Sequence, residues 1–131
     1  MDNAVTLDGI GKSFGSVEVL AGVDLVVAEG SFTALLGPSG CGKTTLLNLI
    51  GGLDRPSTGR IRLGRDVVYS APDAINVPTE RRNIGYVFQS YALWPHMTVL
   101  QNVAYALKIR RMAQQERERQ AKEMLDKLEL S

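Results

Sequence analysis

The residues with the clearest chemical potential lie in one glycine-rich run, GPSGCGKTT, at positions 37–45. Gly37, Gly42, Lys43 and Thr44 fit the spacing G-x-x-x-x-G-K-[ST]. Glycines let a backbone curl until its N–H groups converge on phosphate oxygens, with no Cβ in the way. A lysine at this position reaches the β- and γ-phosphates of a nucleotide, and the threonine hydroxyl can complete the shell of Mg²⁺. The run therefore predicts a phosphate loop that binds a nucleoside triphosphate with magnesium.

The segments on either side have the patterns of the elements that must position this loop. SFTALLG at 31–37 is a short apolar run that predicts a buried strand of a parallel sheet. Apolar residues at helical spacing follow the loop: Leu46, Leu47, Leu49 and Ile50. Gly51 and Gly52 predict the end of that helix. A helix that starts at the loop presents its positive N-terminal end to the bound anion.

The other segments before residue 90 read mainly as strands. Val- and Leu-rich runs with turn residues between them predict a hairpin over 5–10 and 18–28. RIRL at 60–63 predicts a third strand, and NIGYVF at 83–88 predicts a second buried strand of the parallel sheet. The stretch 66–83 contains two prolines and little pattern, which predicts a surface loop.

The C-terminal third is predicted to be helical after an irregular start. SYALWPHMTV at 90–99 is aromatic and interrupted by proline, so we expect no regular element there. Thr98 has the residue type of an N-cap for a helix over 99–109. A second helix is predicted over 113–130, with charges of mixed sign on its solvated side. Its apolar face comprises Ala121, Met124, Leu125 and Leu128.

Composition is typical of one folded domain and excludes several classes of protein. Hydrophobic residues make up 44% of the 131 positions and charged ones 22%, so wholesale disorder is excluded. A formal charge of +1 gives no bulk attraction to nucleic acid, and we expect no nucleic-acid partner. No apolar run approaches the ~20 residues of a membrane-spanning helix. With one cysteine and no secretory signal, the chain is expected to be cytoplasmic.

Three segments taken together resemble a known family. They are KSFG at 12–15, the run over 37–67, and ERRNIGYVFQSYALWPHMTVLQNVAYALK at 80–108. The whole chain resembles the N-terminal half of the ATP-binding subunit of an ABC transporter, within the bacterial importers of iron, polyamine, sulfate and sugar type. This resemblance implies an α/β fold: a partial P-loop NTPase (ABC ATPase) core over 1–131 with an N-terminal antiparallel β subdomain. The cofactors that it implies are ATP and Mg²⁺.

The resemblance also implies a role for individual residues. Residues that match the phosphate loop are Ser39, Gly40, Cys41, Gly42, Lys43, Thr44 and Thr45. Phe14 matches the aromatic that stacks on adenine; a core phenylalanine at a hairpin end is the alternative. Gln89 matches the Q-loop glutamine, which contacts Mg²⁺ and the attacking water and senses the γ-phosphate, although a glutamine after a strand is usually only a polar end residue. Thr44 and Gln89 are thus the predicted magnesium ligands.

An aromatic segment has two open interpretations. It comprises Tyr91, Leu93, Trp94, Pro95 and His96. In the family this neighbourhood forms part of a groove that receives a short helix of the transmembrane permease subunit, but the side chains could equally cap the sheet. The other partner that the resemblance implies is a second ATP-binding subunit in a head-to-tail dimer. Such subunits lie peripherally on the inner face of the plasma membrane.

Several family motifs do not occur in the 131 residues. There is no LSGGQ-type signature, no strand ending in the Asp-Glu pair of the Walker B region, and no later switch histidine. The resemblance places strands from that missing part between 32–36 and 84–88. We therefore expect a truncated chain that is poorly stable and hydrolyses ATP negligibly alone, since the general base is absent. The alternatives are a non-catalytic nucleotide-binding remnant or, with less support, an ABC-type ATPase of DNA repair or translation.

Overall fold

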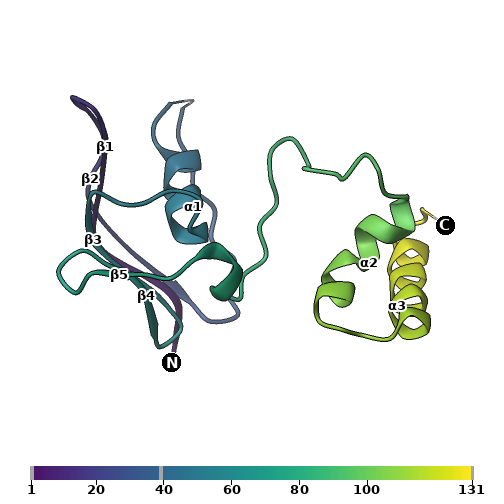
Figure 1. Cartoon of the computed structure of the whole chain (residues 1–131). Coiled ribbons are helices and arrows are strands. Elements are labelled where there is room, and N and C mark those ends of the chain that lie inside the picture. Colours follow the sequence, from purple (N-terminus) through teal and green to yellow (C-terminus); the bar gives the residue numbers. More distant parts are fainter. Residues whose placement is uncertain (1, 39, 131) are drawn as a thin grey trace. The chain divides into compact units, whose positions relative to one another are not determined.

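A computed structural model describes residues 2–38 and 40–130 of the chain (Figure 1). It divides the chain into two compact units, Met1–Tyr86 and Val87–Ser131, which we name unit 1 and unit 2. Unit 1 contains the β-sheet and helix α1, whereas unit 2 contains helices α2 and α3. Each unit is considered by itself below.

Unit 1 is built on an antiparallel sheet. Its strands are β1 (Asn3–Phe14), β2 (Val17–Ala28), β3 (Thr58–Leu63), β4 (Asp66–Ser70) and β5 (Ile75–Asn76). Their order in the sheet is β2-β1-β3-β4-β5, and every neighbouring pair is antiparallel. The predicted hairpin over 5–10 and 18–28 is confirmed, as is the strand at 60–63. β3 pairs directly with β1, with Leu7 opposite Ile61, although a helix separates the two strands in the sequence. The sheet thus brings together segments more than fifty residues apart.

The prediction of a surface loop over 66–83 is wrong in large part. This stretch contains β4, β5 and a 3₁₀ helix at Thr79–Arg81. The missed signal is the two-residue turn at Gly64 and Arg65, which joins β3 to β4 and in which Gly64 has a φ of 62°. That turn lets DVVYS fold back on β3, where Tyr69 is buried and its hydroxyl donates to the Pro56 carbonyl at 2.9 Å. The prolines that suggested a loop lie outside β4 and β5.

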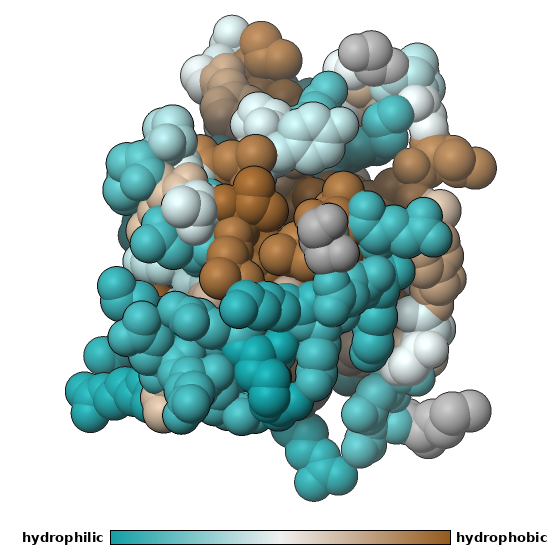
Figure 2. All heavy atoms as spheres, turned by 90° about the vertical axis from the view of Figure 1, so that its right-hand side faces the viewer, coloured by the Kyte–Doolittle hydropathy of each residue, from teal (hydrophilic) through white to brown (hydrophobic). Residues whose placement is uncertain are grey.

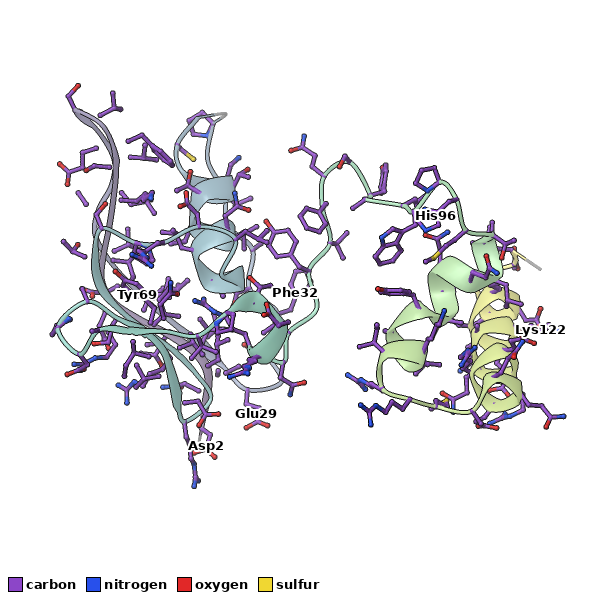
Figure 3. All side chains as sticks on the ribbon, in the orientation of Figure 1. Asp2, Glu29, Phe32, Tyr69, His96 and Lys122 are labelled. Carbon is purple, nitrogen blue, oxygen red and sulfur yellow. The ribbon has the colours of Figure 1, made fainter. Side chains whose placement is uncertain are left out.

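The two predicted parallel strands are not strands in this structure. Neither 31–37 nor 83–88 takes part in a sheet, and most of their apolar side chains are open to solvent, although Leu35 and Tyr86 are partly buried. Phe32 is 96% exposed and Leu36 is 92% exposed, and Phe32 is labelled in Figure 3. A strand of a parallel sheet is stable only when strands on its sides complete its hydrogen-bond ladder. Among the described residues no strand pairs with either segment, which accounts for the failure of both predictions.

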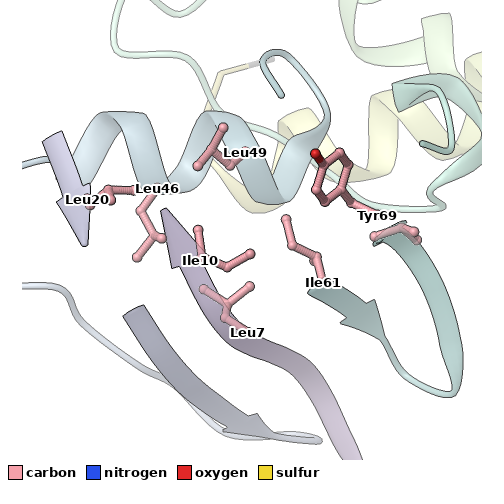
Figure 4. Close-up of a cluster of buried hydrophobic side chains, with 8 residues drawn as sticks. Leu7, Ile10, Leu20, Leu46, Leu49, Ile61 and Tyr69 are labelled. Atoms are coloured by element: carbon pink, nitrogen blue, oxygen red, sulfur yellow. The ribbon is translucent and has the colours of Figure 1, made fainter. Parts of the chain in front are cut away.

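Helix α1 (Lys43–Gly51) packs on the sheet and closes the core of unit 1. The buried cluster comprises Leu7, Ile10, Leu20, Leu46, Leu49, Ile61, Val68 and Tyr69 (Figure 4). Leu46 and Leu49 supply the helix side, as predicted, but Leu47 is 47% exposed and does not belong to the packed face. The helix ends where Gly52 adopts a left-handed conformation and its N–H bonds back to the last turn.

Unit 2 is a pair of helices after an irregular lead-in. Residues 90–97 form no regular element, as predicted, and α2 (Val99–Ile109) follows. Its predicted N-cap is confirmed, because the Thr98 hydroxyl accepts from the backbone N–H of Gln101. In turn, the side-chain Oε1 of Gln101 accepts from the Thr98 N–H. α3 (Gln114–Lys127) falls within the predicted range 113–130. Ala121 and Leu125 are its buried residues, while the other two predicted members of the face, Met124 and Leu128, stay about half exposed.

Candidate phosphate-binding site

The glycine-rich run forms a tight loop that leads directly into α1. Gly40 and Gly42 have φ values of 83° and 98°, which side chains with a Cβ rarely adopt. Gly42 is the N-cap of α1, and no side chain caps the first turn in the described residues. The N–H groups at the start of this helix are therefore left for a ligand, and no acidic residue lies in the first turn to compete for them. Ser39 lies outside the described residues.

Close packing fixes where the loop lies. A Cβ added to Gly42 would come within 2.8 Å of Leu20 Cδ2 on strand β2. A Cβ on Gly37 would come within 2.7 Å of Cys41 Sγ, across the loop. Both distances are well inside van der Waals contact, so a larger residue at either position would require Leu20 or Cys41 to shift. Gly42 thus lets the loop lie close against β2, and Gly37 lets the Cys41 side chain lie across the loop.

Lys43 closes the loop electrostatically. Its Nζ donates to the Gly37 carbonyl at the other end of the loop, so the ammonium group lies across the loop that the motif predicts for phosphate. Thr44, the predicted magnesium ligand, is exposed, and Thr45 is half-buried. The Cys41 thiol is exposed. A positive charge beside unpaired helix N–H groups is the arrangement that a polyphosphate needs, so the residues present fit the predicted ligand.

Phe14 lies at the end of β1, with its side chain 50% exposed. It is therefore not the core phenylalanine of the alternative interpretation. Two residues earlier on the same strand, Lys12 pairs with Leu20, the residue that contacts Gly42. Within unit 1 the sheet thus brings the strand that ends in Phe14 next to the phosphate loop. Stacking of this ring on adenine stays a prediction.

Gln89 belongs to unit 2 and is exposed in an irregular segment. The predicted strand that should position it does not form, because 83–88 has no pairing partner among the described residues. Its contact with Mg²⁺ and water stays a prediction. Within the part of the chain that the structure describes, no group of three His, Cys, Asp or Glu side chains could hold a metal ion by itself.

The aromatic segment before α2 lies against that helix. The rings of Trp94 and Tyr105 have centroids 4.3 Å apart at an interplanar angle of 44°. Asn102, which the sequence did not single out, holds the segment in place. Its amide donates to the carbonyls of Trp94 and Met97, and its Oδ1 accepts from the Trp94 N–H at 2.9 Å. The first turn of α2 therefore fixes the backbone of an otherwise irregular segment.

A pocket of about 450 Å³ opens beside this segment, within unit 2. It is lined by His96, Met97, Leu100, Gln101, Ala104, Tyr105, Lys108, Gln114, Arg117 and Glu118. The lining includes both apolar residues and charged residues of both signs. Tyr91 and Leu93, on the segment that leads to the pocket, are 78% and 72% exposed. In the view of Figure 2, apolar side chains lie mainly in the upper half, whereas the lower half is mainly hydrophilic. Exposed aromatics next to a groove are typical of interaction surfaces.

Arg82 is a second residue that sequence reasoning missed. It is only 4% exposed, and its guanidinium donates to the carbonyls of Leu49 and Ile50 in the last turn of α1, each at 3.0 Å. It also donates to the Val77 carbonyl and to Asn76 Oδ1. Burial lowers the pKa of Arg82 from its ordinary value, but a guanidinium remains charged at neutral pH. A cation here stabilises the negative end of the helix whose positive end starts the phosphate loop.

Comparison with known proteins agrees with this geometry. A family model described as ABC transporter matches residues 20–131. The chain is 46% identical to the sulfate/thiosulfate import ATP-binding protein CysA of Thermosynechococcus vestitus, over 97% of this chain and 36% of that protein. It is also 46% identical to the trehalose/maltose import ATP-binding protein MalK of Thermococcus litoralis, over 97% of this chain and 34% of that protein.

Solved structures give the same result. One is a dimeric ATP-binding cassette in a post-hydrolysis state bound to ADP and Pi, with a TM-score of 0.80 and 34% identity. Another is a dimeric bacterial ABC transporter cassette, with a TM-score of 0.81 and 33% identity. Both matches cover 97% of this chain and 58% of the solved one. The predicted fold class is confirmed. The chain spans about a third of the length of the curated relatives it matches.

Proposed function

Because this chain belongs to the ABC transporter family, we propose that it binds ATP with magnesium as part of a subunit that powers solute import. The observation that carries the proposal is the phosphate loop. Lys43 bridges to Gly37 across a loop in which Gly40 and Gly42 adopt positive φ, and none of the described side chains caps the first turn of α1. Each of these features favours a bound polyphosphate over any neutral ligand.

Each loop residue has a separate task in this proposal. The N–H groups in the first turn of α1 donate to phosphate oxygens, and Lys43 exchanges its carbonyl partner for the β- and γ-phosphates. The Thr44 hydroxyl ligates Mg²⁺, which neutralises phosphate charge when bound. Phe14 stacks on adenine, for which its half-exposed ring is suited. Gln89 senses the γ-phosphate from a segment without regular structure, which suits a residue that must move.

Hydrolysis needs groups beyond those in the 131 residues. The sequence holds no LSGGQ-type signature and no Asp-Glu pair after an apolar strand to act as general base. We therefore propose that the 131-residue polypeptide binds ATP without appreciable turnover. In the assembled subunit, closure of a head-to-tail dimer with a second ATP-binding subunit would complete the site.

The partner on the membrane side is proposed to be a transmembrane permease. Support comes from the pocket beside α2, whose lining combines apolar residues with charges of both signs, and from the exposed Tyr91 on the segment that leads to it. Within residues 2–38 and 40–130, none of the helices has the length and apolar character that crossing a membrane requires. We propose a peripheral position on the inner face of the plasma membrane, reached through the permease.

Equilibrium binding of a fluorescent ATP analogue in the presence of Mg²⁺ tests the proposal. Lys43→Ala should weaken binding about ten- to a hundredfold, since charge-assisted hydrogen bonds of the lysine are lost. Lys122→Ala removes an exposed lysine from α3 and is the matched control, expected to bind like the unmodified chain. Equal affinity of the Lys43 variant and the control would contradict the proposal. Steady release of phosphate would contradict the claim of binding without turnover.

A further inference from the structure

Lys12, on β1 between β2 and β3, has an unusually buried environment for a lysine. Its side chain is only 13% exposed, and its Nζ forms an ion pair with Asp54 Oδ1 at 3.2 Å. The same Nζ donates to the Arg55 carbonyl at 2.7 Å and lies 4.9 Å from the centroid of the Phe14 ring. The proposed function gives this lysine no role, although it contacts the ring expected to stack on adenine. A cation over an aromatic face is attracted by the quadrupole of the ring.

The turn that holds Lys12 is itself anchored to the phosphate-binding helix. The N–H groups of Leu53 and Asp54 both donate to the Asn48 carbonyl of α1, at 2.9 Å and 3.3 Å. Asp54 Oδ1 also accepts from the Arg55 N–H at 2.8 Å. That backbone bond, followed by the Lys12 contact, keeps the pKa of Asp54 below its ordinary value, so the carboxylate is charged at neutral pH. The carboxylate is thus fixed in position and in charge.

The same turn also binds the backbone of β1 just before Phe14. The Ser57 N–H donates to the Gly11 carbonyl at 2.7 Å, and the Ser13 N–H donates to Ser57 Oγ at 3.0 Å. Lys12 therefore lies in a strand segment that is tied to the turn on both sides. A continuous set of contacts runs from α1 through the turn and Lys12 to the ring of Phe14.

We propose that Lys12, held by Asp54, is a positioning residue that pre-sets the Phe14 ring for stacking on the nucleotide base. A ring held by the ammonium on one face loses less conformational freedom when a base stacks on the other. The contacts that join Lys12 to α1 fix the position of the Phe14 ring relative to the phosphate loop, which leads into the same helix. This inference rests on the proposed function, and it concerns the base rather than the phosphates.

Comparison of ATP with inorganic triphosphate, both with Mg²⁺, tests the proposal. Lys12→Met keeps the aliphatic stem and removes the charge. It should weaken ATP binding about three- to tenfold and leave triphosphate binding unchanged. Asp54→Asn should have the same effect to a smaller extent. This second variant still tests the proposal if Lys12→Met fails to fold. Arg65→Met, which removes one exposed positive charge at the β3–β4 turn, is the matched control and should affect neither ligand.

A double-mutant comparison separates positioning from general damage to the fold. In a Phe14→Ala background, Lys12→Met should cause no further loss of ATP affinity, because the ring that it positions is gone. An additive loss, an equal loss for triphosphate, or no loss at all would each overturn the inference. If the unmodified chain binds neither ligand, the proposed function fails and the inference fails with it. If it binds triphosphate as tightly as ATP, only the stacking of the base on Phe14 is refuted, and the proposed phosphate site still stands.

Discussion

The two units of this chain are stabilised in different ways. Unit 1 has a core of buried side chains from five elements, among them Ile10, Leu49 and Ile61 at 0% exposure. In unit 2, the buried apolar residues among those described are Ala104, Ala121 and Leu125, two of them alanines. Burial of large side chains stabilises by about 1.5–3 kcal/mol each, whereas an alanine contributes far less. We infer that unit 1 depends on tertiary packing and unit 2 on local helix interactions such as caps and ion pairs.

The largest expected effect comes from the core of unit 1. Leu49→Ala should lower the free energy of unfolding by about 2–5 kcal/mol, because it leaves a cavity beneath α1. Leu47→Ala, the same substitution two residues earlier on the same helix, should cost much less, since Leu47 is 47% exposed. Denaturant titration followed by circular dichroism measures both. Equal losses would show that α1 is not packed as described.

Loss of the buried arginine should have the next largest effect. Arg82→Met leaves the Ile50 carbonyl without the donor that Arg82 supplies, at a cost of about 1–3 kcal/mol, and leaves the Leu49 carbonyl with the Gly52 N–H as its donor. Arg81→Met alters the exposed neighbour and should change the melting temperature little. The measurement is a thermal melt of both variants. An unchanged melt for the Arg82 variant would mean that α1 does not need this cation at its end.

In unit 2 the capping residue should matter more than any buried side chain of α2. Thr98→Ala removes the capping box at the start of α2 and should destabilise the helix by about 1 kcal/mol. Hydrogen exchange at the backbone N–H of Gln101, which donates to the Thr98 hydroxyl, should become faster. Thr98→Ser keeps the hydroxyl and should exchange like the unmodified chain. Equal protection of the Gln101 N–H from exchange in Thr98→Ala would contradict the inference that unit 2 depends on local helix interactions.

The smallest effect concerns an exposed ion pair on α3. Arg119 donates to both oxygens of Glu116, and these bonds, with one from Gln120, lower the pKa of Glu116 to about 2. Because the folded pKa lies below the ordinary value of 4.5, the pair stabilises α3 above that pH and is lost as pH falls toward about 2. An NMR titration of the Glu116 carboxyl should show this midpoint. In Arg119→Ala it should return toward the ordinary value; an unshifted midpoint in the unmodified chain would contradict the pair.

Elements whose partners are close in sequence could be predicted from the sequence. The β1–β2 hairpin, α1 with its end at Gly52, and α2 with its Thr98 cap all follow from local pattern and turn chemistry. The failures have two causes. β4 was missed because prolines on its flank outweighed the Gly64 turn, and 31–37 and 83–88 were predicted as strands from apolarity alone. An apolar run indicates burial, but pairing partners decide whether it becomes a strand.

The candidate site, too, has features that follow from the sequence and features that depend on the fold. The motif itself determined the phosphate loop, because the types and order of Gly42, Lys43 and Thr44 already specify its chemistry. Only the tertiary structure decided what supports that loop. Lys12, Asp54 and Arg82 lie in segments that resemble the family, but their types and spacing predict no role. Their contacts appear only where β1, the turn after α1 and the residues after β5 come together. A motif can be read from residues a few positions apart, whereas these contacts join residues thirty or more positions apart and depend on the folded chain.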